Sequence, residues 1–206
     1  MLSHSPFIVG YNKVGDNGRS LIRSLNPSTG ESLPDAYPVS DYAELETAVA
    51  SAQSAAVVLR HSAPETIAQF LEAYAAALEA RGDEICRMAA LETALPYEPR
   101  LHTIELGRTT NQLRQAATAV RGRSWRMATI DTAANIRSMY GPLNGPVVIF
   151  GPNNFPLAYN AIAGGDFSAA IAAGNPVIAK AHPGHLSTSR LLAETAWSAL
   201  ETCGLP

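Results

Sequence analysis

The sequence predicts an α/β fold in which an N-terminal hairpin and helices pack on the first β-α-β-α units of a doubly wound, Rossmann-like parallel sheet. Two continuous apolar runs, GPVVIF at 145–150 and NPVIAK at 175–180, are typical of strands buried on both faces. A helical pattern follows each run, at 156–174 and at 187–204, and ends at a glycine. Strands that alternate with helices in this way indicate parallel βαβ units.

Four helices are predicted before this sheet, because apolar residues recur there at helical spacing: 41–60, about 62–81, 83–93 and about 98–120. Asp41 with Glu44, and Ser62 with Glu65, have the spacing of capping boxes at the first two helix starts. Pro156 is expected at the first position of the later helix at 156–174, where its missing N–H costs nothing.

Two hairpin-like segments are predicted outside the helices. Residues 20–40 place short apolar stretches around the turn formers of 26–30. Residues 124–144 alternate loosely and indicate an exposed pair of strands or one long bent ribbon. The chain therefore divides into an N-terminal part (1–123), a ribbon (124–144) and the βαβα unit (145–206).

Composition limits the classes of protein that this chain can represent. It has 206 residues, of which 47% are hydrophobic and 16% charged, with a formal net charge of −3 and no long basic stripe. This argues against nucleic acid as a partner. The sequence offers neither a signal-peptide pattern nor a membrane span, so a cytoplasmic protein is expected. Cys86 and Cys203 form no CxxC pair, so no metal site is predicted from them.

The turn FGPNNFP, at 150–156, carries two asparagines at the end of the first apolar strand. Ligands of open α/β sheets bind beyond the carboxyl ends of the strands. Asn153 and Asn154 lie at such an end, and Lys180 ends the neighbouring strand. A carboxamide there can donate to a developing oxyanion, and a lysine can bind a nucleotide hydroxyl or phosphate. The alternative is that the asparagines only shape the turn and that Lys180 is a surface charge.

Several motifs, in order along nearly the whole chain, resemble those of the aldehyde dehydrogenase superfamily: NPSTGE (26–31), ALEARGDEICRMAALETALP (77–96), GPVVIFGPNNFP (145–156) and AAGNPVIAKAHP (172–183). The chain departs from the family pattern at Ala94, where glycine is usual, at Asn153 in the place of tryptophan, and at Ala181 and Pro183 after the lysine. The stretches at 105–114, 153–166 and 179–185 resemble the α-ketoglutaric semialdehyde and NADP-dependent fatty aldehyde dehydrogenases.

This resemblance implies an NAD(P)-dependent oxidation of an aldehyde, such as α-ketoglutaric semialdehyde, to a carboxylate through a cysteine thiohemiacetal. It implies that Asn154 is the oxyanion-hole amide. It also implies that the cofactor contacts Phe150, Gly151, Pro152, Asn153, Lys180, His182 and Pro183. NADP is the expected cofactor, with NAD possible, because 180–190 holds Lys180, His182, His185 and Arg190 and no acid. The intact protein is expected to form a homodimer or homotetramer through the ribbon at 124–144.

The family's cysteine nucleophile and glutamate base lie in segments that do not occur in these residues. The resemblance therefore implies the N-terminal part of such an enzyme, without the catalytic domain and inactive alone. Cys86 and Cys203 are predicted to be packing residues. A truncated, non-catalytic paralogue that acts as a binding or assembly module is the alternative. His182-x-x-His185 lacks a third ligand, so no metal is predicted there.

Overall fold

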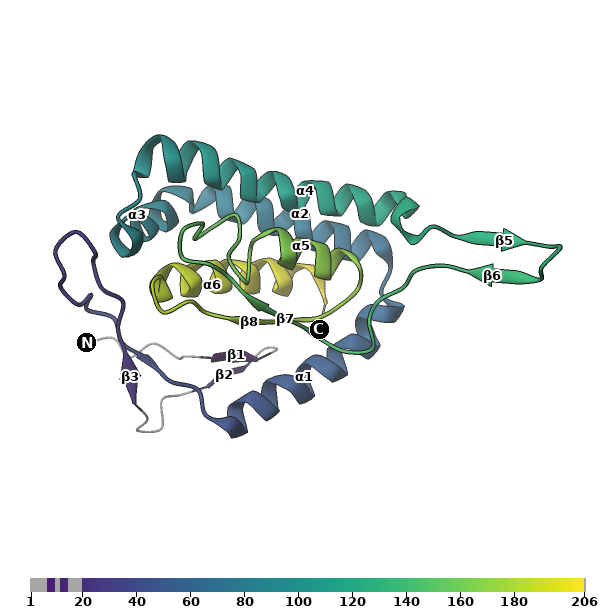
Figure 1. Ribbon diagram of the computed structural model, residues 1–206, viewed down its shortest axis with the longest axis horizontal. Coiled ribbons are helices and arrows are strands. Elements are labelled where there is room, and N and C mark those ends of the chain that lie inside the picture. The colour runs from purple at the N-terminus through teal and green to yellow at the C-terminus, as the bar shows by residue number, and fades with distance from the viewer. Residues whose placement is uncertain (1–6, 10–11, 15–19, 206) are drawn as a thin grey trace.

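The structure, a computed structural model, describes residues 7–9, 12–14 and 20–205 of the chain. It is a mixed α/β assembly in which helices surround a short parallel sheet and a β-ribbon protrudes from the body (Figure 1). In chain order the elements are β1 (Phe7–Val9), β2 (Asn12–Val14), β3 (Leu21–Ile22), β4 (Tyr37–Pro38), α1 (Tyr42–His61), α2 (Pro64–Ala80), α3 (Gly82–Thr93), the π-helical segment η1 (Tyr97–Leu106), α4 (Gly107–Gly122), the 3-10 turn η2 (Ser124–Arg126), β5 (Thr129–Asp131), β6 (Ile136–Ser138), β7 (Val147–Phe150), α5 (Gly165–Ala172), β8 (Val177–Lys180) and α6 (Leu186–Cys203).

The predicted β-α-β-α unit is confirmed by β7, α5, β8 and α6. Strands β7 and β8 pair in parallel, in a register that sets Phe150 opposite Lys180. The expectation that both faces are buried is wrong for β7. Ile149 packs into the core, but Val148 is 49% and Phe150 72% exposed. Side chains alternate between the faces of a strand, so one face of β7 is covered by helices and the other is open in the described part of the chain.

The core lies between the helices and the inner face of the sheet, with Tyr74 of α2 fully buried at its centre. The Tyr74 Oη lies 3.1 Å from the carbonyl oxygens of both Ile162 and Leu192. Burial raises the pKa of Tyr74 well above its ordinary value, which keeps the phenol neutral and able to donate. The Phe167 ring meets the Tyr74 ring edge-on at 5.8 Å. One aromatic residue thus joins α2 to α5, to α6 and to the turn before α5.

The predicted hairpin at 20–40 is confirmed by β3 and β4, which pair antiparallel, and by a bridge between Leu25 and Ser32. Gly30 closes the turn at a φ of 75°, a left-handed conformation that glycine adopts without steric cost. A further antiparallel pair, β1 with β2, was not predicted from the sequence. Of the first 19 residues, only the backbone of these two strands falls within the described part of the chain.

One of the two predicted capping boxes is present. Asp41 accepts from the Glu44 N–H at 2.9 Å, and the Glu44 carboxylate accepts from the Asp41 N–H at 3.3 Å. The second is wrong, because α2 begins at Pro64 without a side-chain cap and Ser62 instead ends α1. Helix α3 ends at Thr93 as predicted, with Ala94 at a φ of 57°. A left-handed residue at a helix end favours glycine, which explains the glycine of the family motif.

Two helix predictions need correction. The helix predicted from about 98 becomes regular α4 only at Gly107, because η1 precedes it and Glu98 is extended. The helix predicted at 156–174 is α-helical only from Gly165, and residues 156–164 form successive turns. In those turns, some backbone N–H groups bond to nearby carbonyls and others bond to side chains. The Leu157 and Ala158 N–H groups donate to Glu105, and the Ile162 N–H donates to the Asn160 side chain.

The ribbon predicted at 124–144 is confirmed as the antiparallel pair β5 and β6, which extends away from the helices (Figure 1). Every residue of the two strands is exposed, including Ile130 and Ile136. Among the described residues, no helix combines the length and the apolar character that crossing a bilayer requires.

Candidate functional site at the carboxyl ends of β7 and β8

Two loops meet where the parallel strands end: residues 151–156 after β7 and residues 181–185 after β8. His185, buried between them, has its Nε2 atom 3.0 Å from the Pro152 carbonyl and its Nδ1 atom 3.1 Å from the Ser189 hydroxyl. Because a carbonyl only accepts, Nε2 is the donor to Pro152. A Cβ added at Gly184 would lie 3.5 Å from the Asn153 Cβ. The sheet edge therefore brings the two predicted loops into direct contact.

Gly151 fixes the direction in which the chain leaves β7. It is buried, and a Cβ there would lie 2.8 Å from the Tyr159 carbonyl oxygen and 2.9 Å from the Ala161 nitrogen. Neither neighbour is a flexible side-chain end, so a larger residue would force the backbone of the following turn to move. The glycine lets 159–161 lie against the strand end and directs residues 152–154 outward.

A buried carboxylate holds the turn that follows the two asparagines. Glu105 of η1 is 1% exposed, and its Oε1 accepts from the N–H groups of Leu157 at 2.8 Å and of Ala158 at 3.0 Å. Its other oxygen pairs with the guanidinium of Arg100. A buried charge requires this combination of a counter-ion and filled lone pairs. Glu105 therefore sets the path of the backbone at 157–158.

Arg100 carries the same network to Asn154. Its Nη2 donates to the Asn154 carbonyl at 2.9 Å, and its guanidinium carbon lies 4.4 Å from the centre of the Phe155 ring. Glu105 and Arg100 together thus fix the backbone on both sides of Phe155. A fixed backbone limits the positions that the Asn154 side chain can take.

The carboxamides of Asn153 and Asn154 are exposed, and neither forms a hydrogen bond within the described residues. Asparagines that shape a turn do so through side-chain bonds to nearby backbone groups. Here the turn is held by Arg100, Glu105 and His185 instead. The turn-forming interpretation therefore does not account for either asparagine, and both amides are available to a ligand.

The predicted cofactor residues line the same edge. Phe150, Pro152, Lys180 and Pro183 are exposed, and Lys180 has no ion-pair partner in the described part of the chain. His182 is half-buried, and burial, helped by the nearby His185 and Lys180, lowers its pKa. Its Nδ1 accepts from the Gly184 N–H at 3.0 Å. An exposed ring and an ammonium without an ion-pair partner are groups that can contact a nucleotide.

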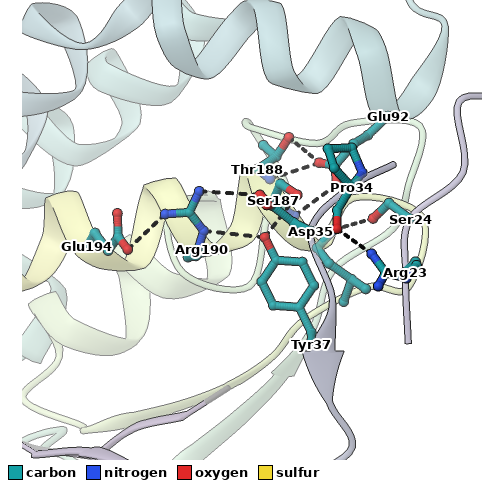
Figure 2. Close-up of polar contacts among 11 residues, drawn as sticks. Arg23, Ser24, Pro34, Asp35, Tyr37, Glu92, Ser187, Thr188, Arg190 and Glu194 are labelled. Carbon is teal, nitrogen blue, oxygen red and sulfur yellow. Dashed lines mark hydrogen bonds and ion pairs between the residues drawn. The ribbon is translucent and has the colours of Figure 1, made fainter. Parts of the chain in front are cut away.

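The cations used to predict NADP do not all lie at this edge. Figure 2 shows Arg190 of α6 bound instead to the N-terminal hairpin and to its own helix. Its guanidinium reaches the Tyr37 hydroxyl at 3.3 Å, Glu194 at 2.9 Å and Asp35 at 3.9 Å. His185 is buried against Pro152, and the lowered pKa of His182 favours its neutral form. Lys180 is the member of that set that remains an exposed cation.

Sequence reasoning missed two glutamates that organise the site. Glu92 is 3% exposed and accepts from the N–H groups of Ser187 and Thr188, both at 2.8 Å, at the start of α6 (Figure 2). Glu105 does the same for Leu157 and Ala158. The sequence signal that could have identified these two glutamates is their position among the apolar residues of a helix. Each carboxylate occupies the buried helical face, as in Ile85, Ala89, Glu92 and in Leu101, Glu105, Thr109, where it must receive hydrogen bonds.

The two cysteines are not placed beside Asn154. Cys86 is fully buried in α3, and burial, with nearby carboxylates, raises its pKa to about 12. Cys203 lies at the C-terminal end of α6, whereas the asparagine turn contacts the N-terminal end of that helix through His185. A helix of 18 residues is about 27 Å long. Across the described residues, no three histidine, cysteine, aspartate or glutamate side chains group in a way that could hold a metal ion.

The sequence and the fold match an established family. The model of the aldehyde dehydrogenase family matches residues 14–206, so the chain belongs to that family. Members of this family are oxidoreductases that use NAD(P).

Two relatives within this family are similar to the chain in sequence. The chain is 38% identical to alpha-ketoglutaric semialdehyde dehydrogenase 2 of Azospirillum brasilense over 97% of its own length and 39% of the relative's. It is 35% identical to alpha-ketoglutaric semialdehyde dehydrogenase of Acinetobacter baylyi over 90% of its length and 36% of the relative's. Succinate-semialdehyde dehydrogenase of Burkholderia pseudomallei shares the fold, with a TM-score of 0.81 at 23% identity, over 100% of this chain and 40% of that one. The chain thus spans less than half of the proteins that it matches.

Proposed function

We propose that this chain is the N-terminal part of an NAD(P)-dependent aldehyde dehydrogenase that oxidises a semialdehyde, and that Asn154 supplies its oxyanion-stabilising amide. The observation that carries the proposal is the exposed carboxamide of Asn154 at the carboxyl end of β7, on a backbone held by Arg100 and Glu105. An amide fixed before the reaction stabilises charge that develops in the transition state without reorganising. The substrate class rests on the relatives' names and on their identity of 35–38%.

The chain's own residues would act in two places. The Asn154 amide would donate to the aldehyde oxygen as that oxygen becomes negative, after attack by a nucleophile that these residues do not include. Lys180 would hold the adenosine ribose or its 2′-phosphate, with Phe150, Gly151, Pro152, Asn153, His182 and Pro183 around it. The bound dinucleotide would supply the hydride acceptor.

We expect NADP to be the better cofactor, although fewer cations support this preference than the sequence pattern indicates. A 2′-phosphate is attracted by Lys180, and no carboxylate stands at Pro183 to repel it or to bind a free ribose hydroxyl. Arg190 does not contribute, because it is bound to Tyr37, Asp35 and Glu194. The preference should therefore depend on Lys180.

The test is a steady-state assay of the complete gene product with α-ketoglutaric semialdehyde and either NADP or NAD. The proposal expects oxidation, with higher kcat/KM for NADP, and expects Lys180→Ala to raise the KM of NADP more than that of NAD. A complete product that binds nucleotide or partner chains but oxidises no aldehyde would overturn it in favour of a non-catalytic paralogue. A higher kcat/KM for NAD would overturn the cofactor preference alone.

A further inference from the structure

Arg108, near the start of α4, lies against the aromatic residues that follow the candidate oxyanion donor. Its Nη2 donates to the Tyr159 hydroxyl at 2.6 Å, and its guanidinium carbon lies 4.8 Å from the Tyr159 ring centre. The same carbon is 5.9 Å from the ring centre of Phe155, the residue next to Asn154. Phe155 and Tyr159 meet edge-on at 5.1 Å. Arg108 is therefore held at the same surface as Asn154 and lies close to Phe155, the residue that follows it.

Arg108 differs from the nearby arginines in its charge balance. Arg100 pairs with Glu105, Arg114 with Glu79, and Arg121 with Glu65 and Glu72. Arg108 is exposed and has no carboxylate partner among the described residues; its contacts are a phenol and two ring faces. One bond to Tyr159 leaves most of its N–H donors unused. The site thus presents a guanidinium without a counter-ion among the described residues, beside the rings of Phe155 and Tyr159.

We propose that Arg108 is a specificity-determining residue, which binds a carboxylate at the far end of an aldehyde substrate while Phe155 and Tyr159 contact its carbon chain. The inference rests on the proposed function, and it assigns the selection of acidic aldehydes to one side chain. A guanidinium presents a planar fork of donors that matches a carboxylate, and the Tyr159 bond orients that fork before the substrate arrives. Arg100 cannot take this role, because Glu105 and the Asn154 carbonyl already occupy it.

The experiment compares two five-carbon substrates of the complete enzyme, α-ketoglutaric semialdehyde and pentanal, in wild type, Arg108→Gln and Arg114→Gln. Charge-assisted hydrogen bonds contribute enough that their loss lowers kcat/KM by about 10- to 100-fold. We expect Arg108→Gln to show that loss for the semialdehyde, through KM, and little change for pentanal. The control Arg114→Gln, on the same helix but paired with Glu79, should change neither. Equal losses for both substrates, or no loss for the semialdehyde, would overturn the assignment.

A binding measurement separates this inference from the proposed function. Glutarate, a five-carbon dicarboxylate, should bind the wild type and Arg114→Gln in calorimetry and should bind Arg108→Gln about 10-fold or more weakly. If the wild type oxidises neither aldehyde but the three proteins rank in this way with glutarate, the proposed function fails and the carboxylate site stands. If glutarate binds all three equally, the carboxylate site fails whatever the activity.

Discussion

Glu105 illustrates how a buried charge directs the local backbone. Its carboxylate accepts two backbone N–H groups and pairs with Arg100, and in doing so it fixes the backbone where the turns of residues 156–164 begin. Glu92 is the matching case at the start of α6, where it caps a helix that is distant in the sequence. Both positions stabilise turns or helix ends that frame the asparagine loop.

Replacing Glu105 by glutamine should destabilise the complete protein by about 1–3 kcal/mol, because Arg100 loses its counter-ion and faces an NH2 group, which cannot accept, while the oxygen that accepts the two N–H groups loses its charge. Hydrogen exchange at the Leu157 and Ala158 amides should accelerate more than elsewhere. Glu98→Gln is the matched control, since Glu98 is an exposed acid of the same segment and its ion pair with His102 is screened by solvent, so its loss should cost much less than that of Glu105. Equal effects of the two variants in denaturant unfolding would show that Glu105 does not hold the turn.

Residue-level roles were predictable from the sequence only where they depend on near neighbours. The Asp41–Glu44 capping box and the strand-end position of Asn154 and Lys180 followed from spacing alone. The roles of Arg100, Glu105 and Arg190 did not. Their partners Asn154, Leu157 and Tyr37 lie 54, 52 and 153 residues away in the sequence. For this reason the sequence could not show that Arg190 and His185 are bound to other parts of the chain and do not face the candidate cofactor site.

The ribbon of β5 and β6 is the element whose exposure most needs an explanation. Ile130 is 73% exposed and Tyr140 65%, on a two-stranded ribbon with unpaired edges that extends from the body (Figure 1). Isolated ribbons of this kind are marginal in water, and natural proteins pair or cover them. We therefore propose that it contacts another subunit in the intact protein.

The double replacement Ile130→Lys and Ile136→Lys should shift the intact protein to smaller species in sedimentation velocity, because charges would be buried at the contact. Lysines at Gln115 and Thr118, exposed positions of α4, provide a control with the same added charge. A ribbon variant that sediments like the wild type and like this control would remove the ribbon from the assembly contact.

Helices and strands could be predicted from the sequence where their apolar residues recur at a single regular spacing. Apolar spacing predicted α1 to α4, α6 and the two parallel strands, and it misplaced mainly the helix starts. It failed at 156–164, where tertiary packing overrides local helical propensity: the turns pass so close to Gly151 and Gly164 that a Cβ on either glycine would meet backbone atoms at under 3.0 Å. It missed β1 and β2, whose three-residue strands give too short an alternation to detect.

At the scale of the whole molecule, the open face of β7 determines how these 206 residues should bind dye and unfold when they are expressed alone. Val148 and Phe150 expose large apolar surface on a strand with a single described neighbour. In parallel sheets such a face is normally covered. The apolar run at 145–150 predicted burial on both faces, so the open side of β7 is a surface that a further part of the intact protein would cover.

Expressed alone, the 206-residue chain should bind a hydrophobic dye strongly, unfold broadly and oxidise no aldehyde. Exposed apolar patches bind such dyes, and neither cysteine can serve Asn154: Cys86 is buried with a pKa of about 12, and Cys203 lies at the far end of α6. Cys86→Ala and Cys203→Ala variants serve as controls. A sharp thermal transition with turnover that one of these replacements abolishes would contradict the expectation.

The most direct test of the account compares Asn154→Ala with Asn153→Ala in the complete enzyme, measuring kcat and KM for α-ketoglutaric semialdehyde. Loss of an oxyanion donor acts mainly on the transition state, so Asn154→Ala should lower kcat by about 10²- to 10³-fold with little change in KM. Asn153→Ala, at an equally exposed position of the same turn that the proposal places beside the cofactor, should lower kcat much less than Asn154→Ala. An unchanged kcat for Asn154→Ala, or equal losses for the two variants, would contradict the assignment of the oxyanion donor.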